Sequence, residues 1–276
     1  MHIARSTLDN LTYQANQFAT LPSSELNFKR NRLLCPGCGV PAFFRQASQM
    51  SGRAACFGAR PHASGCHLAA PEFDRKYQED DDGYTQSELG NLSKRIVLDL
   101  NFGAAPKPSI NSQDGVITDV DDCIGGSRLN GSHRHEVTLR RLRPLLKALT
   151  KSTHFNNSTQ LIEIPNRSVT TVADFFVNFN NIGPNHEGQY HGFWGMVTNA
   201  QFGNAGTLWL NAGGWNDVSI CLPYEFGGVV CERFGIKEPE ELSGAFVLIL
   251  GEIRVANNGK RCLKLHGIDL ITIDLP

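Results

Sequence analysis

The feature that most constrains this chain is the pentapeptide Cys35-Pro-Gly-Cys38-Gly39, a zinc knuckle. Two cysteines three positions apart on a turn present two thiolates to one metal ion, and the glycines let backbone amides point at the sulfur atoms. Zinc binds four nitrogen or sulfur ligands in a tetrahedron, so a second pair of ligands is expected nearby. The candidates that follow the knuckle are Cys56, His62, Cys66 and His67.

The segment His62-Ala-Ser-Gly-Cys66 repeats the arrangement, with two ligand types four positions apart around a glycine. We therefore predict one Zn²⁺ ion per chain, held by Cys35, Cys38, His62 and Cys66, with Cys56 in place of His62 as the alternative. Four protein ligands leave no open position for water, which indicates a structural rather than a catalytic ion. Few large apolar residues surround these ligands, so we expect the segment to need its metal to fold.

The segment from 28 to 75 resembles a zinc ribbon, on the strength of its Cys-Pro-Gly-Cys knuckle and its second ligand pair. Members of that family bind nucleic acid or proteins. More loosely, a cysteine pair followed by Pro61-His62 resembles the N-terminal zinc elements of competence-type and phage-defence proteins. The resemblance is confined to this module.

The charges are unevenly distributed along a chain whose formal net charge is only −1. Residues 28–71 hold six basic residues and no acidic one. Basic clusters on a near-neutral chain indicate a phosphate-bearing or acidic partner, with a solvated surface as the alternative interpretation. The cluster from which we predict nucleic-acid contacts is Arg30, Arg32, Arg45, Arg53 and Arg60.

Residues 189–276 have the clearest pattern of elements. Three short strands are expected first, at 193–197, 207–211 and 218–222. A helix is expected next, at 224–234. Two more strands are expected at 245–255 and 261–273, and the tight turn Asn257-Asn-Gly259 joins them. This order resembles an oligonucleotide/oligosaccharide-binding (OB) fold, in which a helix lies between the third and fourth strands of a five-stranded barrel. The resemblance implies a single-strand-binding face with exposed aromatic residues.

Trp215 lies in a glycine-rich polar loop, so we predict that it stacks on bases, whereas Trp194 and Trp209 lie on strands and are interpreted as core residues. The last hairpin carries four cations that we also predict to contact nucleic acid. Residues 189–276 nevertheless hold nine acidic and six basic residues, which fits either a polarised barrel or a protein-binding one. The four cations are Arg254, Lys260, Arg261 and Lys264.

The remaining segments complete a multidomain α+β organisation. Residues 1–27 are expected to form an N-terminal arm, and residues 76–188 an acidic linker, centred on Glu79–Gly83, with a middle α/β region. Within that region we expect a helix at 172–179. The most catalytic-looking string is Ser132-His133-Arg-His135-Glu136, and no recognised spacing supports a nuclease built on His133, His135 and Glu136.

These patterns favour a non-enzymatic nucleic-acid-binding protein, with single-stranded DNA or RNA as its partner. One alternative is a protein-protein adaptor in a replication, mobile-element or defence complex, and a second is a metal-dependent nuclease. The longest apolar run, 245–250, is far shorter than the roughly 20 residues that cross a bilayer. The N-terminus lacks an apolar signal core, so a cytoplasmic location without membrane contact is expected.

Overall fold

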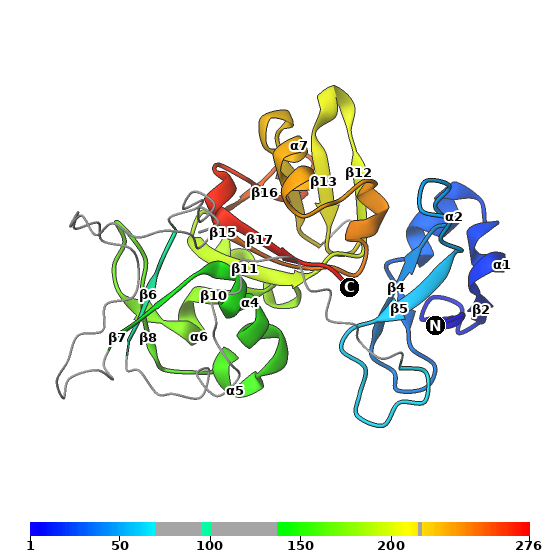
Figure 1. The fold of residues 1–276 in the computed structure, drawn as a ribbon, viewed down its shortest axis with the longest axis horizontal. Helices are drawn as coiled ribbons and strands as arrows, with labels where there is room; N and C mark the ends of the chain where they lie inside the picture. Colours follow the sequence, from blue (N-terminus) through cyan, green and yellow to red (C-terminus); the bar gives the residue numbers. More distant parts are fainter. Residues whose placement is uncertain (70–94, 101–136, 215–216) are drawn as a thin grey trace, which may run out of the picture.

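A computed structural model describes residues 1–69, 95–100, 137–214 and 217–276, and shows a mixed α+β chain with three sheets and short helices (Figure 1). No helix among these residues is long and apolar enough to cross a membrane. The N-terminal unit lies beside the C-terminal strands, and the middle region covers another side of them.

The N-terminal unit is a five-stranded antiparallel sheet in the order β2-β1-β3-β4-β5. Its core is aromatic: the rings of Phe18, Phe44 and Phe57 meet pairwise at centroid distances of 4.9–5.3 Å. The elements of this unit are β1 (Ile3–Ser6), β2 (Thr12–Gln14), α1 (Ala15–Ala19), α2 (Ser23–Lys29), β3 (Leu33–Leu34), β4 (Pro41–Arg45) and β5 (Cys56–Ala59).

Residues 1–27 therefore do not form the separate arm expected from the sequence. They supply β1, β2, α1 and most of α2 to the same unit as the cysteine-rich segment. Phe18 and Leu26, from α1 and α2, are buried in the shared core. Residues 1–27 therefore complete the core to which the cysteine-rich segment contributes Leu33, Phe44 and Phe57.

The C-terminal sheet is continuous in the order β10-β11-β15-β16-β14-β13-β12, with β17 paired to β15. The pairs β10/β11 and β14/β16 are parallel, and the other neighbours are antiparallel. Only Val197 and Thr198 separate β11 from β12. The strands are β10 (Phe176–Asn178), β11 (Tyr190–Met196), β12 (Asn199–Phe202), β13 (Leu208–Asn211), β14 (Ser219–Leu222), β15 (Phe246–Val255), β16 (Arg261–Lys264) and β17 (Ile271–Asp274).

The longest helix of this unit lies between β14 and β15, where the sequence predicts it. The other helical segments are short 3₁₀ helices. The expected last strand, 261–273, is divided into β16 and β17. The helical segments are α7 (Tyr224–Arg233), η1 (Phe179–Asn181), η2 (Pro184–His186), η3 (Asn204–Gly206), η4 (Pro239–Leu242) and η5 (Ile268–Leu270).

The middle region forms a four-stranded sheet in the order β7-β6-β8-β9, in which β6 is parallel to both β7 and β8. The expected helix at 172–179 is shorter than predicted: it ends at Phe175, and Phe176 begins β10. The elements are β6 (Arg95–Leu98), β7 (Val137–Arg140), α4 (Leu142–Lys151), α5 (Thr153–Asn156), β8 (Leu161–Glu163), β9 (Thr170–Thr171) and α6 (Val172–Phe175).

The middle region shares its core with the C-terminal sheet because β15 is buried on both faces. Side chains alternate along a strand, so Val247 and Ile249 lie in one apolar cluster while Leu248 and Leu250 lie in another, together with Leu146 of α4. The middle region is therefore built onto the C-terminal unit rather than folded around a separate core.

Candidate functional site

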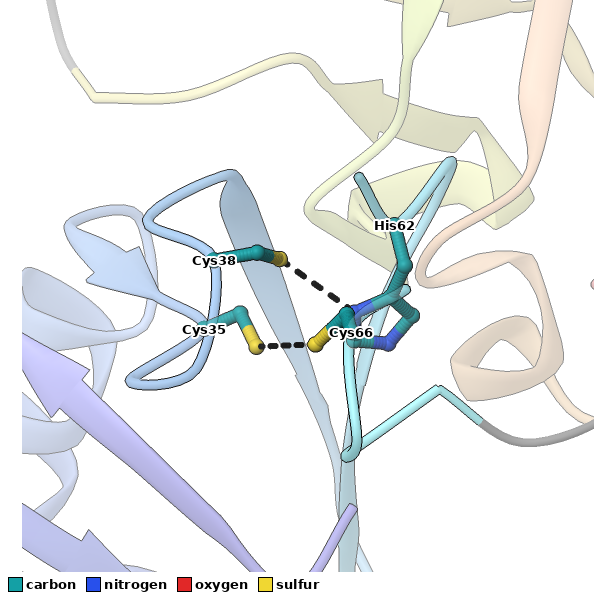
Figure 2. A group of neighbouring side chains, drawn as sticks. All are labelled: Cys35, Cys38, His62 and Cys66. Carbon is teal, nitrogen blue, oxygen red and sulfur yellow. Dashed lines mark hydrogen bonds between the residues drawn. The ribbon is translucent and has the colours of Figure 1, made fainter. Parts of the chain in front are cut away.

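Four side chains of the N-terminal unit form a compact group that could hold a metal ion (Figure 2). The thiols of Cys35, Cys38 and Cys66 and an imidazole nitrogen of His62 all lie within 4.8 Å of one another. Within the described part of the chain this is the only such group found. These four residues are the set that the sequence places first, and they lie close enough to hold one metal ion.

The distances within the group fit a tetrahedral zinc ion. Zinc–sulfur bonds of about 2.3 Å and zinc–nitrogen bonds of about 2.0–2.1 Å put two tetrahedral sulfurs about 3.8 Å apart, and a sulfur and a nitrogen about 3.6 Å apart. The Sγ atoms of Cys35 and Cys66 are 3.8 Å apart. The distance from Cys38 Sγ to His62 Nδ1 is 3.5 Å.

Two short turns present the ligands. The knuckle joins β3 to β4, where the Cys35 N–H donates to the Val40 carbonyl and the Gly39 N–H donates to the Cys35 carbonyl, both at 2.8 Å. A side chain at Gly37 would crowd the second turn: a Cβ there would lie 3.1 Å from His67 Cε1 and 3.2 Å from Cys66 Sγ. The second turn follows β5, and its Cys66 N–H donates to the Ala63 carbonyl.

The electrostatics of the two knuckle cysteines differ. Backbone N–H groups of Ala63 and Val40 lower the pKa of the Cys38 thiol to about 6, which favours the thiolate that binds metals. Burial raises the pKa of the Cys35 thiol, because a buried thiolate loses its hydration. A bound cation compensates that loss of hydration, so a buried Cys35 is suited to ligation.

Cys56, the alternative ligand, does not belong to the group. It opens β5, where it pairs with Arg45 on β4. His67, the remaining candidate, is exposed and also lies outside the group.

Several arginines that we expected at phosphate instead join the N-terminal unit to the C-terminal one. The Arg30 guanidinium is 4% exposed, and its Nη2 donates to the Phe44 carbonyl, to Glu240 Oε1 at 2.8 Å and to Ser243 Oγ. Arg45 donates to the carbonyl oxygens of Glu241 and Ser243. These two guanidinium groups bind protein, and the basic character of the sequence overstates the charge offered to a ligand.

Two more arginines of the cluster, Arg53 and Arg60, are also in contact with the protein. Arg60 Nη2 lies 3.0 Å from Asp274 Oδ2 on β17, and Arg53 Nη2 donates to the Gln46 carbonyl at 3.4 Å. Arg32 is exposed.

A cleft of about 890 Å³ lies between the N-terminal unit and the C-terminal sheet. Helix α2 and the residues just after it form one wall, and β12, β13 and β14 form the other, with the β15–β16 hairpin at the end. The lining includes two aromatic side chains, Phe28 and Trp209, and two cations, Arg32 and Lys260. It also includes the amides Asn27, Asn31, Gln201, Asn204, Asn211 and Asn258.

The strand register explains which residues face the cleft. On β13, Leu208 and Leu210 are buried in the core, so Trp209 and Asn211 lie on the opposite face. Across the strands, Gln201 pairs with Trp209, and Trp209 with Cys221. A hydrogen bond also joins the two walls, because Thr198 Oγ1 donates to Asn31 Oδ1 at 2.8 Å.

The hairpin cations occupy different environments. Lys260 Nζ donates to the carbonyls of Gly214 and Asp217 at 2.9 and 2.7 Å, and burial lowers its pKa. Arg261 Nε donates to Glu187 Oε1 at 3.1 Å. Arg254 and Lys264 are exposed.

Four predicted residues lie outside the described part of the chain: Trp215, His133, His135 and Glu136. Two aromatic residues line the cleft against expectation: Trp209, which we interpreted as a core residue, and Phe28, for which we made no prediction. The alternation of Leu208-Trp-Leu-Asn211 is the signal that places Trp209 opposite the core, although we interpreted it as a core residue. No sequence signal marks Phe28, which is 69% exposed on α2.

No protein-family model matches the chain, and no curated protein matches it. Among solved structures, one similar chain is described as "a putative aspartyl-tRNA synthetase from Leishmania major Friedlin", with 9% sequence identity and a TM-score of 0.26. The match covers 36% of this chain and 20% of the synthetase chain, so this chain spans about a fifth of the length of the synthetase chain. A TM-score this low does not show a shared fold.

Proposed function

We propose that this protein is a non-enzymatic binder of single-stranded nucleic acid, which occupies the cleft between the N-terminal unit and the C-terminal sheet. One structural Zn²⁺ per chain is held in a module of the zinc-ribbon kind, by the side chains of Cys35, Cys38, His62 and Cys66. The zinc ion takes no part in chemistry, because its four protein ligands fill a tetrahedron. Its role is to hold the turns of the module whose helix α2 forms one wall of the cleft.

The C-terminal unit is proposed to be an OB-like barrel. Strand connectivity supports this: β11 and β12 together act as the first strand, followed by β13, β14, α7, β15 and β16. The third and fifth strands in that count, β14 and β16, are parallel neighbours, and β15 pairs with β11. The cleft then lies over the second and third strands and the last hairpin, where OB folds bind their ligands.

The observation that carries the proposal is the composition of the cleft. Aromatic residues stack on unpaired bases, amides hydrogen-bond to base edges, and cations attract phosphate. The cleft presents all three kinds, and none of the described residues that line it is acidic. The acidic excess of the C-terminal unit therefore lies elsewhere on its surface.

A single strand fits better than a duplex for a physical reason. Stacking on Trp209 or Phe28 requires a base face that is not covered by its neighbours in a double helix. The volume of about 890 Å³ lies within the range of about 300–1,000 Å³ of sites that enclose a small ligand, which suits a few unpaired nucleotides.

The test is the affinity of the zinc-loaded protein for fluorescent single-stranded and duplex oligonucleotides of DNA and RNA, measured by anisotropy. We expect single strands to bind more tightly than duplexes. Phe28→Ala should weaken single-strand binding by about 1–3 kcal/mol, since that is the contribution of one stacked base. Because the Phe28 side chain is exposed, the substitution should leave the melting temperature unchanged, which a thermal melt checks.

Tyr224→Ala is the matched control, because Tyr224 is 76% exposed on α7 and does not line the cleft. Equal losses in both variants would argue against a specific site. Absence of single-strand binding at low salt would instead favour the protein-adaptor alternative. Metal-dependent cleavage of the oligonucleotides would favour the nuclease alternative.

A further inference from the structure

The cleft is rich in amides and poor in cations. Six of its lining residues are Asn or Gln, whereas only Arg32 and Lys260 are basic. A site that follows a phosphate backbone without regard to sequence uses a positively charged groove. Base edges, by contrast, are read by hydrogen bonds, and Asn and Gln are the side chains that pair with adenine edges in a bidentate manner.

The two cations do not offer equal contact to phosphate. Lys260 already donates to two carbonyl oxygens, those of Gly214 and Asp217, so its ammonium group is held against the protein. Arg32 is exposed at the other wall. Arg30, one residue before the lining residue Asn31, is committed to the joint between the two units through Glu240.

The amides are arranged around the aromatic residue on the strands. Gln201 stands directly across from Trp209, at the spacing of about 5 Å that cross-strand neighbours share. Asn211 lies two residues further along β13 on the same face, and its Oδ1 accepts from Ser219 Oγ at 2.6 Å. That bond holds the amide in one orientation, with its Nδ2 donor directed away from Ser219.

A base stacked on the Trp209 indole would therefore have amide groups along its edge, on a rigid sheet. We propose that this cleft recognises the bases of a short unpaired segment, with Gln201 and Asn211 as the groups that select among bases, and draws little of its affinity from phosphate. This inference rests on the proposed function and deepens it, from a binder of single strands to a sequence-selective one.

The experiment measures binding of the zinc-loaded full chain to four labelled DNA homo-octamers, of dA, dC, dG and dT, across a salt series. Two phosphate contacts predict a slope of log affinity against log salt of about −1.4, because each contact to a single strand contributes about −0.7. Affinities for the best and worst octamer should differ by at least about fivefold, the lower bound for one good amide–base pair.

Gln201→Met removes the amide while keeping a side chain of similar length. We expect it to bring the four affinities closer together, with the salt slope unchanged. Gln14→Met is the matched control, since Gln14 is an exposed glutamine on β2 outside the cleft. Asn211→Ala, which keeps the strand but removes the second amide, should also reduce the preference.

Tight binding of all four octamers within twofold, with a slope of about −3 or steeper, would overturn this inference and leave the proposed function standing. A base preference that Gln201→Met and Asn211→Ala both leave intact would also overturn it. If no octamer binds at low salt, the proposed function fails, and the inference fails with it.

Discussion

The N-terminal and C-terminal units hold their shapes by different means. Among the residues that the structure describes, the C-terminal sheet encloses a buried apolar cluster of 23 residues, whereas the N-terminal cluster has ten, four of which are alanines. Apolar burial supplies most of the free energy of folding in proportion to the area removed from water. We therefore expect the smaller unit to depend more on a metal ion held by its group of four candidate ligands and on charged contacts with its neighbour.

The largest effect is expected from removing the metal, which should destabilise the N-terminal unit and leave the C-terminal unit unchanged. In Cys66→Ser we expect the zinc content to fall from about one per chain to nearly none, and the N-terminal unit to unfold at a lower temperature. Structural zinc sites contribute roughly 10 kcal/mol or more in isolated zinc-finger peptides at pH 7. Elemental analysis and calorimetry measure the two effects.

Cys56→Ser is the matched control for that variant, because Cys56 lies outside the ligand group. It should keep its zinc and its N-terminal transition. The transition of the C-terminal unit should be unchanged in both variants. If Cys66→Ser retained one zinc ion per chain, the proposed ligand set would be refuted.

A smaller effect is expected at the joint between the units. Glu240→Ala leaves the buried Arg30 guanidinium with only the neutral oxygens of Phe44 and Ser243. Removing one partner of a buried ion pair costs about 3–5 kcal/mol, because the remaining charge is uncompensated. Urea denaturation measures that loss.

Glu241→Ala provides the comparison, because only the backbone oxygen of Glu241 accepts from Arg45. We expect it to be close to wild type in urea. The joint also positions α2 against the strands, so Glu240→Ala should weaken binding in the cleft. Similar stabilities of the two variants would show that the ion pair does not hold the joint.

The smallest effect is expected at the surface of the N-terminal unit. The Lys29 ammonium, helped by the Tyr13 hydroxyl, holds the pKa of the Asp9 carboxyl well below its usual range. The stabilisation is therefore complete above the ordinary pKa of about 3.9 and is lost as pH falls toward the lower folded value. Because the carboxyl is close to solvent, Asp9→Asn should lower the melting temperature by at most about 3 °C at pH 7.

A pH series of melting temperatures checks the sign of that prediction. The difference between wild type and Asp9→Asn should shrink as pH falls below 4, since both carry a neutral side chain at that position once Asp9 is protonated. A difference that grew on acidification would contradict the pairing of Asp9 with Lys29.

The group of four candidate metal ligands could be predicted from the sequence because its geometry is local. Cys35 and Cys38 belong to one turn and His62 and Cys66 to another, and the backbone of a short turn is set by a few neighbouring residues. The order of strands and helix in the C-terminal unit followed in the same way from alternation and from the turn at Asn257-Asn-Gly259, whose Gly259 has a φ of +82°.

The cleft was not predictable in this way, because its two walls come from opposite ends of the chain. Phe28 and Asn31 meet the strands only after the N-terminal unit has docked. The alternation along β13 marks Trp209 as facing away from Leu208 and Leu210, but a strand buried on both faces has the same pattern as one that lines a cleft.

The sequence by itself determined the group of four candidate ligands, the mixed α+β class and the positions of β11, β13, β14, α7 and β15, since each depends on residues close together in the chain. Only the tertiary structure decided which basic residues remain exposed to a ligand. Arg30 finds its carboxylate 210 positions away, at Glu240. A charge run shows how many cations a segment has, but the partners that desolvate and neutralise them are brought near only by the packing of the folded chain.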